Sequence, residues 1–590
     1  MDEIIKKLFE QDKKEQMQKV QDDVTGEKDH PTKIWALGGI DEIGKNMYCF
    51  QQGEEIFIVD CGIKFADEDL PGVGGIICPF DSLVEKKDRV KGLIITHAHE
   101  DHIGGIPYLL MTMDIPKIYG SQLAIEFIKK RLKEFPNIKF NNYEIINDST
   151  VIKTNEFKIE FYRVCHSIPD AFGIYLETKN ARIVESGDYK FDFGASGDEF
   201  DILKAAEIGR RDVDVLLCES TNAETPGFGA SEKYVIEELR GLIEYAPGRV
   251  FVSTFASNLQ RIEEIIQLGL KMNRKICLFG RSMNANVQIA LNLGLLNVSK
   301  EQIIDSADLN KYPDNEIMIL CTGSQGEEMA ALNQMAIGRN QRVVFKKTDT
   351  VILSSNPIPG NFESVENLIN KLYIAGVNVC VNTKESKIHS SGHATQVEQQ
   401  LLIKLINPQY IIPIHGEFKM LRALRQNAID AGVHPDNIVQ ISRGQVVEVL
   451  DHKIISTEKF VDIFDVYVNN GKIDYDSTST LKYRKVLSKD GVVNVTLVLN
   501  YKTMQFLMQP TITTKGTFFV KDSQALLGKI AYAIKDKLNA FLKRSKFINN
   551  NYIRKMVSST VQFYVWSNKR KNPIVRTTIF ELNDEPKVNQ

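Results

Sequence analysis

The sequence contains no long apolar run. No segment approaches the roughly 18 consecutive apolar residues that mark a membrane-spanning helix, and the opening residues MDEIIKKLFE lack the apolar core of a signal peptide. These absences argue against a membrane-embedded or secreted protein. We therefore expect a cytoplasmic protein without a membrane partner.

Cysteine is sparse, and no two cysteines form a C-x-x-C pair. The eight cysteines are scattered through 590 residues. This usage is typical of a reducing compartment, and it argues against both a disulfide framework and a zinc site built from thiolates. The chain is too long for one hydrophobic core, and its length suggests roughly three or four structural units.

Acidic residues are scarce in one part of the chain only. The formal net charge of the whole chain is −3, but residues 481–590 hold 20 Lys and Arg against 6 Asp and Glu, a balance of +14. The other residues therefore carry about −17, with 53 basic against 70 acidic side chains. Such asymmetry points to a polyanionic partner, although a solvated lysine-rich face explains it equally well.

The pattern of apolar residues changes several times along the chain. Strand-like runs that end on a polar residue come first, and after about residue 225 amphipathic helices alternate with short apolar runs, which is typical of βαβ units and a parallel sheet. The first pattern resumes near residue 380. The expected divisions are a charged leader, disordered or helical (1–30), the first part of an α/β domain (31–225), an inserted parallel-sheet domain (226–378), the second part of the α/β domain (379–460), a polar linker poor in strands (461–480) and a basic α+β domain (481–590).

Within the basic domain, three elements are predicted. The run VVNVTLVL alternates apolar and polar residues as a strand does, and the apolar spacing near 523–547 indicates a helix. We expect the run VSSTVQFYVW, residues 557–566, to form a closing strand.

Histidine is rare, and its distribution is uneven. Of ten histidines, seven follow apolar runs in loops that contain Gly, Ser or Pro. Three of the seven lie in H-x-H-x-D-H, directly after the apolar run GLIIT, together with Asp101. Neutral imidazole and carboxylate are good zinc ligands, so this spacing predicts a metal site. The seven are His97, His99, His102, His166, His389, His393 and His415.

The Asp-His pair of the H-x-H-x-D-H box can turn toward a second metal ion. The six-residue box cannot supply all the ligands of two ions, so further donors are expected from distant loops. Asp188 in ESGDYKFD also follows a strand-like run and a glycine, and it is the natural bridging carboxylate. A chance cluster of polar loop residues is the competing interpretation of the H-x-H-x-D-H box.

Many ordered motifs resemble those of the ribonuclease J family, in the β-CASP nuclease branch of the metallo-β-lactamase superfamily. The motifs between about residues 33 and 460 are ALGGIDEIGKNM, DCGIKF, THAHEDHIGG, CHSIPD, GDYKFD, ESTNAE, STFASNLQR, GRSM, TGSQGE, PIPGN, HSSGHA and PIHGE. The resemblance implies an α/β fold: a metallo-β-lactamase αββα sandwich with an inserted parallel-sheet β-CASP domain and a small α+β C-terminal domain.

The resemblance also implies two metal sites per chain. One zinc would be bound by His97, His99 and His166, the other by Asp101, His102 and His415, with Asp188 shared. Mn²⁺ or Mg²⁺ are alternatives to Zn²⁺. The residues assigned a catalytic role are Asp101, Asp188, Glu219 and His393.

Phosphodiester hydrolysis is the chemistry that such a site would perform. Two metals would acidify a water molecule and polarise a phosphate oxygen. His393 is the candidate acid for the leaving 3′ oxygen, and Glu219 would orient it. A capping or ion-pair role for Glu219 stays open, as does a plain Ser-Gly turn for HSSGH. The residues expected to contact substrate are Ala256, Ser257, Asn258, His389, Ser390, Ser391, Gly392 and His393.

The expected function is a zinc-dependent ribonuclease that degrades single-stranded RNA. By resemblance it would act from 5′-monophosphate ends in the 5′-to-3′ direction and also as an endonuclease, in mRNA decay and rRNA maturation. It would form a homodimer or a higher oligomer, or assemble with a paralogue. A DNA-directed or purely endonucleolytic β-CASP nuclease and a non-catalytic partner subunit of an RNA-decay complex remain alternatives.

Overall fold

The computed structural model describes residues 30–66, 70–194, 197, 199–358, 361–474, 477–545 and 547–581. The predicted leader, residues 1–30, lies outside them apart from His30. The chain divides into two compact units, Met1–Lys64 with Ile77–Asp465 and Phe65–Ile76 with Val466–Gln590.

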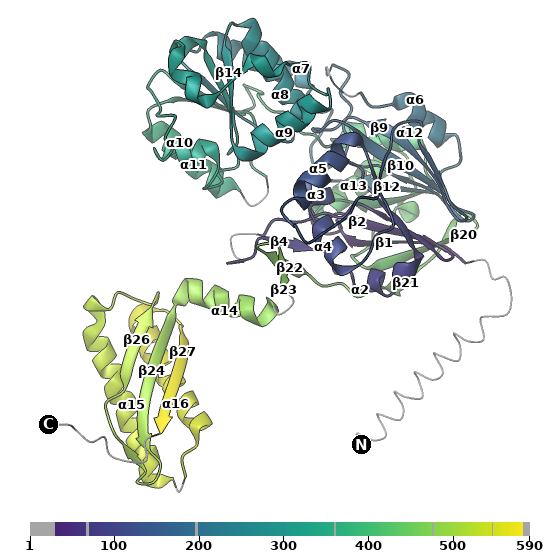
Figure 1. Ribbon diagram of the computed structural model, residues 1–590. Helices are drawn as coiled ribbons and strands as arrows, with labels where there is room; N and C mark the ends of the chain where they lie inside the picture. Colours follow the sequence, from purple (N-terminus) through teal and green to yellow (C-terminus); the bar gives the residue numbers. More distant parts are fainter. Residues whose placement is uncertain are drawn as a thin grey trace. The chain divides into compact units, whose positions relative to one another are not determined.

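Two mixed sheets face each other in the first unit (Figure 1). Apolar side chains of both sheets, such as Phe50 and Phe57 from one and Phe161 and Phe172 from the other, form the core between them. The eight strands of the first sheet, in spatial order, are β21 (Lys453–Phe460), β20 (Gln445–Leu450), β1 (Thr32–Gly38), β2 (Met47–Gln52), β3 (Glu55–Val59), β5 (Val90–Ile94), β6 (Ile118–Gly120) and β7 (Tyr143–Ile145). The six of the second are β19 (Tyr410–Ile414), β12 (Val215–Glu219), β11 (Arg182–Glu185), β10 (Ala171–Glu177), β9 (Lys158–Val164) and β8 (Val151–Lys153).

Helices accompany both sheets of this sandwich. A second apolar cluster joins the second sheet to its helices through residues such as Leu216, Leu402 and Leu424, and α5 contacts β6 and β7 of the first sheet. The helices are α2 (Asp81–Val84), α3 (Glu100–Ile103), α4 (Ile106–Thr112), α5 (Gln122–Leu132), α6 (Ile202–Gly209), α12 (Gln396–Ile406) and α13 (Phe418–Asp430). The predicted αββα sandwich is confirmed.

The segment inserted between β12 and α12 builds a third sheet, whose six strands all pair in parallel (teal in Figure 1). Apolar runs alternate with helices because each parallel strand needs a crossover connection. In spatial order the strands are β15 (Ile303–Ile304), β14 (Lys275–Phe279), β16 (Ile317–Cys321), β13 (Val250–Ser253), β17 (Thr350–Leu353) and β18 (Asn378–Val381). The helices are α7 (Glu232–Glu244), α8 (Leu259–Lys271), α9 (Arg281–Asn292), α10 (Ala331–Ala336) and α11 (Phe362–Ile374).

The second unit is a small α+β structure. Residues Val493, Val495 and Leu497 pack against two long helices to form its core. Its elements are β4 (Gly75–Ile77), β22 (Val466–Asn469), β23 (Lys472–Asp474), α14 (Ser477–Asp490), β24 (Val492–Asn500), β25 (Gln505–Phe506), β26 (Thr511–Lys515), α15 (Gln524–Arg544), α16 (Asn550–Lys569) and β27 (Ile574–Glu581).

Two predictions about this unit are wrong. The run VSSTVQFYVW lies within helix α16, and β27 is the strand that pairs with β24. Its β-branched residues favour a strand, but Val557, Val561 and Val565 recur every four residues and bury one helical face. The part of the predicted linker around 468–480, which was expected to be poor in strands, contains β23 and the last residues of β22, and these two strands pair antiparallel. The predicted domain boundaries themselves stay predictions. Every described helix is too short or too polar to cross a membrane.

Candidate metal centre

The predicted donors follow the ends of strands in the sandwich. The H-x-H-x-D-H box follows β5, and its His99 precedes the first residue of α3. The parallel strands β11, β12 and β19 are adjacent, so their carboxyl ends meet at one edge of the sheet. Asp188, Glu219 and His415 lie at these ends, and His166 follows β9. Loops distant in sequence thereby converge on one place.

The first group of donors consists of His97, His99 and His166. His97 Nε2 and His166 Nε2 each lie 3.1 Å from His99 Nδ1. Nitrogens bound tetrahedrally to one zinc at about 2.0–2.1 Å lie about 3.3 Å apart. The spacing of these imidazoles therefore fits a shared divalent cation.

The second group consists of Asp101, His102, Asp188 and His415. His415 Nε2 lies 3.3 Å from Asp101 Oδ2, and His102 Nε2 lies 3.2 Å from Asp188 Oδ2. The same Asp188 oxygen lies 3.7 Å from His97 Nε2 in the first group. Asp188 is thus the carboxylate between the two groups.

Unpaired polar atoms in the centre support the same fit. Asp188 Oδ2 and His415 Nε2 are buried and have no hydrogen-bond partner among the residues that the structure describes. Buried polar atoms without partners are costly, and metal coordination is one way in which proteins satisfy them. Together with the nitrogen spacing, these atoms fit the divalent-metal use typical of such a donor set.

Neighbouring groups fix the orientation of the imidazoles. His102 Nδ1 donates to Asp60 Oδ2 over 2.6 Å, and Thr96 Oγ1 also donates to that carboxylate. His166 Nδ1 donates to the carbonyl oxygen of Gly392 over 2.7 Å. In the neutral form of both rings the proton then lies on Nδ1, and Nε2 is the nitrogen that can bind a metal; the amide nitrogen of Asn46 lies 3.1 Å from His102 Nε2. Gly392 must be glycine because a Cβ there would lie 2.8 Å from His166 Cε1.

Burial and charge set the ionisation of these groups. Burial lowers the pKa of His97 well below 6.5 and that of His99 to about 4, which keeps both rings in the neutral, metal-binding form. Burial would raise the pKa of Asp188, but the neighbouring His415 and His102 outweigh it and hold this pKa well below its usual range. The centre thus holds a carboxylate among imidazoles, ready to balance cationic charge.

Glu219 and His393 form a pair beside the donor groups. Glu219 is fully buried, and its carboxylate accepts from the backbone N–H groups of Thr221 and Ala394. His393 Nδ1 lies 3.5 Å from Glu219 Oε1 and 3.7 Å from Asp188 Oδ2. Burial lowers the pKa of His393, but these two carboxylates outweigh it and raise the pKa above 6.5.

Arg261 of α8 contacts two residues of the HSSGH loop (389–393). This guanidinium is 1% exposed; it lies 2.7 Å from His389 Nδ1 and donates to the carbonyl oxygen of Ser390. Its charge is balanced by Glu232, which it contacts through two hydrogen bonds. Because Arg261 can only donate, His389 Nδ1 accepts, and the proton of the neutral ring lies on Nε2.

The other predicted substrate residues lie near this loop in varied roles. Asn258 caps α8, and its side chain accepts from the N–H of Arg261. The hydroxyl of Ser390 donates to the carbonyl oxygen of Ala230, whereas Ser391 Oγ accepts from the N–H of His393. Ala256 accepts from Asn286 through its carbonyl oxygen, and Ser257 is half-buried. Substrate contact by these residues stays a prediction.

Sequence reasoning missed Asp60, Thr96 and Arg261. Asp60 carried a signal, because it ends a strand-like run as the predicted donors do. Arg261 is the last residue of the quoted motif STFASNLQR, but no role was assigned to it, since an arginine three residues into an amphipathic helix is ordinarily a surface residue.

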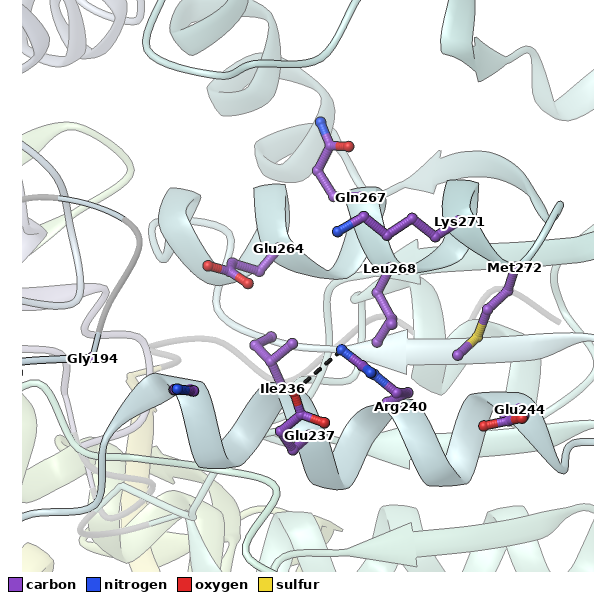
Figure 2. Close-up of a pocket in the computed structure, with 11 residues that line it drawn as sticks. Gly194, Ile236, Glu237, Arg240, Glu244, Glu264, Gln267, Leu268, Lys271 and Met272 are labelled. Atoms are coloured by element: carbon purple, nitrogen blue, oxygen red, sulfur yellow. Dashed lines mark hydrogen bonds and ion pairs between the residues drawn. The ribbon is translucent and has the colours of Figure 1, made fainter.

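A separate cavity of about 580 Å³ lies between α7 and α8 (Figure 2). It contains no predicted site residue, and its acidic and basic side chains are equal in number, so it offers a polyanion no net attraction. These side chains are Lys233, Arg240, Lys271, Glu237, Glu244 and Glu264.

Comparison with protein families gives four matches along the chain. Residues 40–191 match the metallo-beta-lactamase superfamily, and residues 247–372 match the ribonuclease J beta-CASP domain. Residues 378–437 match the Zn-dependent metallo-hydrolase RNA specificity domain, and residues 479–582 match the ribonuclease J C-terminal domain.

Individual proteins are similar over almost the whole chain. A Mycoplasma genitalium protein named ribonuclease J is 45% identical over 553 residues, which cover 93% of this chain and 97% of the relative. Ribonuclease J 1 of Streptococcus pyogenes is 37% identical over 92% of this chain and 96% of its own. A crystal structure of an Enterococcus faecalis protein of unknown function covers 71% of this chain and all of its own, with a TM-score of 0.51 and 16% identity, and it supports the fold alone.

Proposed function

The chain belongs to the ribonuclease J family of metal-dependent ribonucleases, and from this premise we propose that it shortens RNA from the 5′ end. It removes nucleotides in the 5′-to-3′ direction from RNAs with a 5′-monophosphate, and it also cuts internally. Its substrates are single-stranded mRNA and rRNA precursors, and it acts in mRNA decay and rRNA maturation in the cytoplasm. The observation that carries the proposal is the convergence of two donor groups on Asp188, beneath the HSSGH loop.

We assign seven residues to two zinc ions. His97, His99 and His166 would hold one, Asp101, His102 and His415 would hold the other, and Asp188 would be shared. When bound, the two ions activate a water molecule and stabilise negative charge on the phosphate. Metal analysis of the purified protein tests the number and the element, with Mn²⁺ and Mg²⁺ as the alternatives to Zn²⁺.

His393 supplies the proton for the leaving group. Attack of water on phosphorus breaks the bond to the 3′ oxygen of the preceding nucleotide, and that oxygen needs a proton. Glu219 and Asp188 outweigh burial and raise the pKa of His393 above 6.5, which favours the protonated ring that can donate. Glu219 orients this ring because two backbone N–H groups hold its carboxylate in place.

The HSSGH loop receives the 5′-terminal phosphate. Burial, with the Arg261 charge beside it, lowers the pKa of His389 to about 3, so the ring is neutral. Each cleavage leaves a 3′-hydroxyl on the released nucleotide and a new 5′-monophosphate on the shortened RNA. The product therefore carries the same end group as the substrate, which favours repeated removal of nucleotides.

RNAs of one sequence with 5′-monophosphate, 5′-triphosphate or 5′-hydroxyl ends test this mode. With the label in the first nucleotide, we expect release of labelled mononucleotide from the monophosphate form alone. Equal attack on matching DNA would contradict the RNA assignment. Absence of hydrolysis by the fully metallated protein would make it a non-catalytic subunit. Light scattering distinguishes a homodimer or higher oligomer from a monomer.

A further inference from the structure

The last long helix, α16, exposes large aromatic side chains. Its core-facing side is buried, through residues such as Ile553 and Val561. On the other side Tyr552, Phe563 and Trp566 are 51%, 66% and 52% exposed. Large apolar side chains that gather on a surface mark binding sites more often than chance exposure does.

These aromatic residues share one helical face with two cations. At 3.6 residues per turn, six residues of α16, its C-cap included, fall along one line of the helix surface, and we call them the α16 stripe. Two of them, Tyr552 and Trp566, lie about 21 Å apart along the helix axis. The Arg570 guanidinium lies 5.7 Å from the centre of the Trp566 ring, and Phe541 of α15 stacks on Tyr552 with ring centres 4.7 Å apart. The α16 stripe consists of Tyr552, Lys555, Ser559, Phe563, Trp566 and Arg570.

The charge around the α16 stripe selects the class of ligand. Residues 537–580 contain ten Lys and Arg and no Asp or Glu. The basic charge of this segment attracts a polyanion, and exposed aromatic rings offer stacking platforms that are available only to unpaired bases. Single-stranded nucleic acid satisfies both features, whereas the bases of a duplex are already stacked.

We infer that the α16 stripe is a second RNA-binding surface, which stacks bases on its aromatic rings and pairs phosphates with Lys555 and Arg570. The inference rests on the proposed function for its ligand, single-stranded RNA. It adds a surface, in the basic second unit, that the donor groups and the HSSGH loop do not supply.

Tryptophan fluorescence gives a direct test, because the chain has only two tryptophans. Trp35 is 2% exposed and its indole N–H has no hydrogen-bond partner within the described part of the chain, so Trp35→Phe leaves Trp566 as the single reporter. Titration with a hydrolysis-resistant phosphorothioate oligouridylate should quench this emission in a saturable way. Fluorescence anisotropy of the same oligonucleotide, labelled with a dye, gives the Kd for its binding to the protein without the Trp35→Phe substitution.

Substitutions on the stripe should weaken binding in steps. We expect Trp566→Ala to raise Kd about tenfold, and Trp566→Ala with Phe563→Ala about a hundredfold. Tyr532→Ala is the matched control, because Tyr532 is 73% exposed on the neighbouring helix α15 and lies one turn from Asp536. This control should bind as the unchanged protein does.

Three outcomes would overturn the inference. These are absence of quenching, wild-type affinity in both stripe variants, or an equal loss in Tyr532→Ala. A lower molar mass of the double variant in light scattering, at unchanged RNA affinity, would make the stripe a contact between copies of this chain. Hydrolysis of a trinucleotide tests the proposed function separately. Quenching of Trp566 fluorescence without hydrolysis would refute the proposed function alone. Hydrolysis without quenching would refute RNA binding by the α16 stripe alone.

Discussion

Under our two proposals, the donor groups and the α16 stripe would contact RNA in opposite ways. His97 and Asp188 are 0% and 2% exposed, and the donor side chains come from strand ends scattered between residues 97 and 415. The α16 stripe comes from one helix, and Phe563 is 66% exposed. The first is held rigid by neighbouring groups, whereas the second projects into solvent.

This difference has energetic consequences. Buried polar groups that share partners act as a unit, so loss of one member disables the others. Exposed aromatic rings and cations contribute in small, separable amounts that depend on salt. We therefore expect substitutions in the donor groups to have large effects that do not add, and substitutions in the stripe to have small effects that do.

The largest effect should come from Asp188→Asn. This carboxylate is shared by both donor groups, so its loss should lower kcat about 10,000-fold and reduce the bound metal. Quenching of Trp566 by RNA should persist. Hydrolysis rates and metal analysis measure the first two effects, with the exposed Asp436→Asn as the control. Full activity in Asp188→Asn would refute the metal assignment.

The candidate donors were predictable from a local signal, whereas their division into two groups came from the family resemblance. Metal-ligand residue types stand directly after apolar strands, and adjacent parallel strands bring Asp188 and His415 together at one sheet edge. The roles of the residues that support the donors were not predictable, although these residues lie in or beside the quoted motifs. Arg261 acquires its role only when α8 meets Glu232 and the HSSGH loop, which are contacts between distant segments.

Contacts between distant segments also explain why residues 557–566 were wrongly predicted to form a strand. The run VSSTVQFYVW has the composition of a strand, and only its packing against α15 and the sheet makes it a helix. Read as a strand, Phe563 and Trp566 fall on opposite faces, whereas on a helix they share one. The α16 stripe was therefore invisible until the structure was known, although the basic charge of residues 481–590 was evident in the sequence.

The second largest effect should be on stability, through Glu232→Gln. Arg261 and Lys190 hold the pKa of the buried Glu232 carboxylate at about 2 against the effect of burial, whereas an unfolded Glu titrates near 4.3. A lowered pKa stabilises the fold above the unfolded value, so about 3 kcal/mol is present at pH 7 and is lost as the pH falls from about 4.5 toward 2.

Thermal unfolding of Glu232→Gln at a series of pH values checks this prediction. The variant should melt well below the unchanged protein at pH 7, and the gap should narrow below about pH 4.5. Glu237→Gln, on the exposed side of the same helix, should differ little at any pH. A gap that is constant with pH would show that Glu232 acts through packing and not through charge.

A smaller effect should follow Asp60→Asn, because Asp60 orients His102 without belonging to either donor group. Replacing such a supporting carboxylate typically costs about 10–100-fold in metal affinity. Competition with a chelator measures that affinity, and excess metal should restore most of the hydrolysis rate. Failure of excess metal to restore activity would mean that Asp60 shapes the catalytic geometry and not only the affinity.

The smallest effect should come from one charge on the exposed surface, through Lys555→Gln. If Lys555 contacts one phosphate, its loss should lessen the slope of log Kd against log salt concentration by about 1 and leave kcat at saturating RNA unchanged. Lys529→Gln is the matched control, since Lys529 is exposed on α15 and lies off the stripe. An equal change in both variants would mean that the basic unit attracts RNA only as a diffuse positive field. In that case no defined residues of the α16 stripe would bind RNA, and the comparison between a buried and an exposed RNA-binding surface would no longer hold.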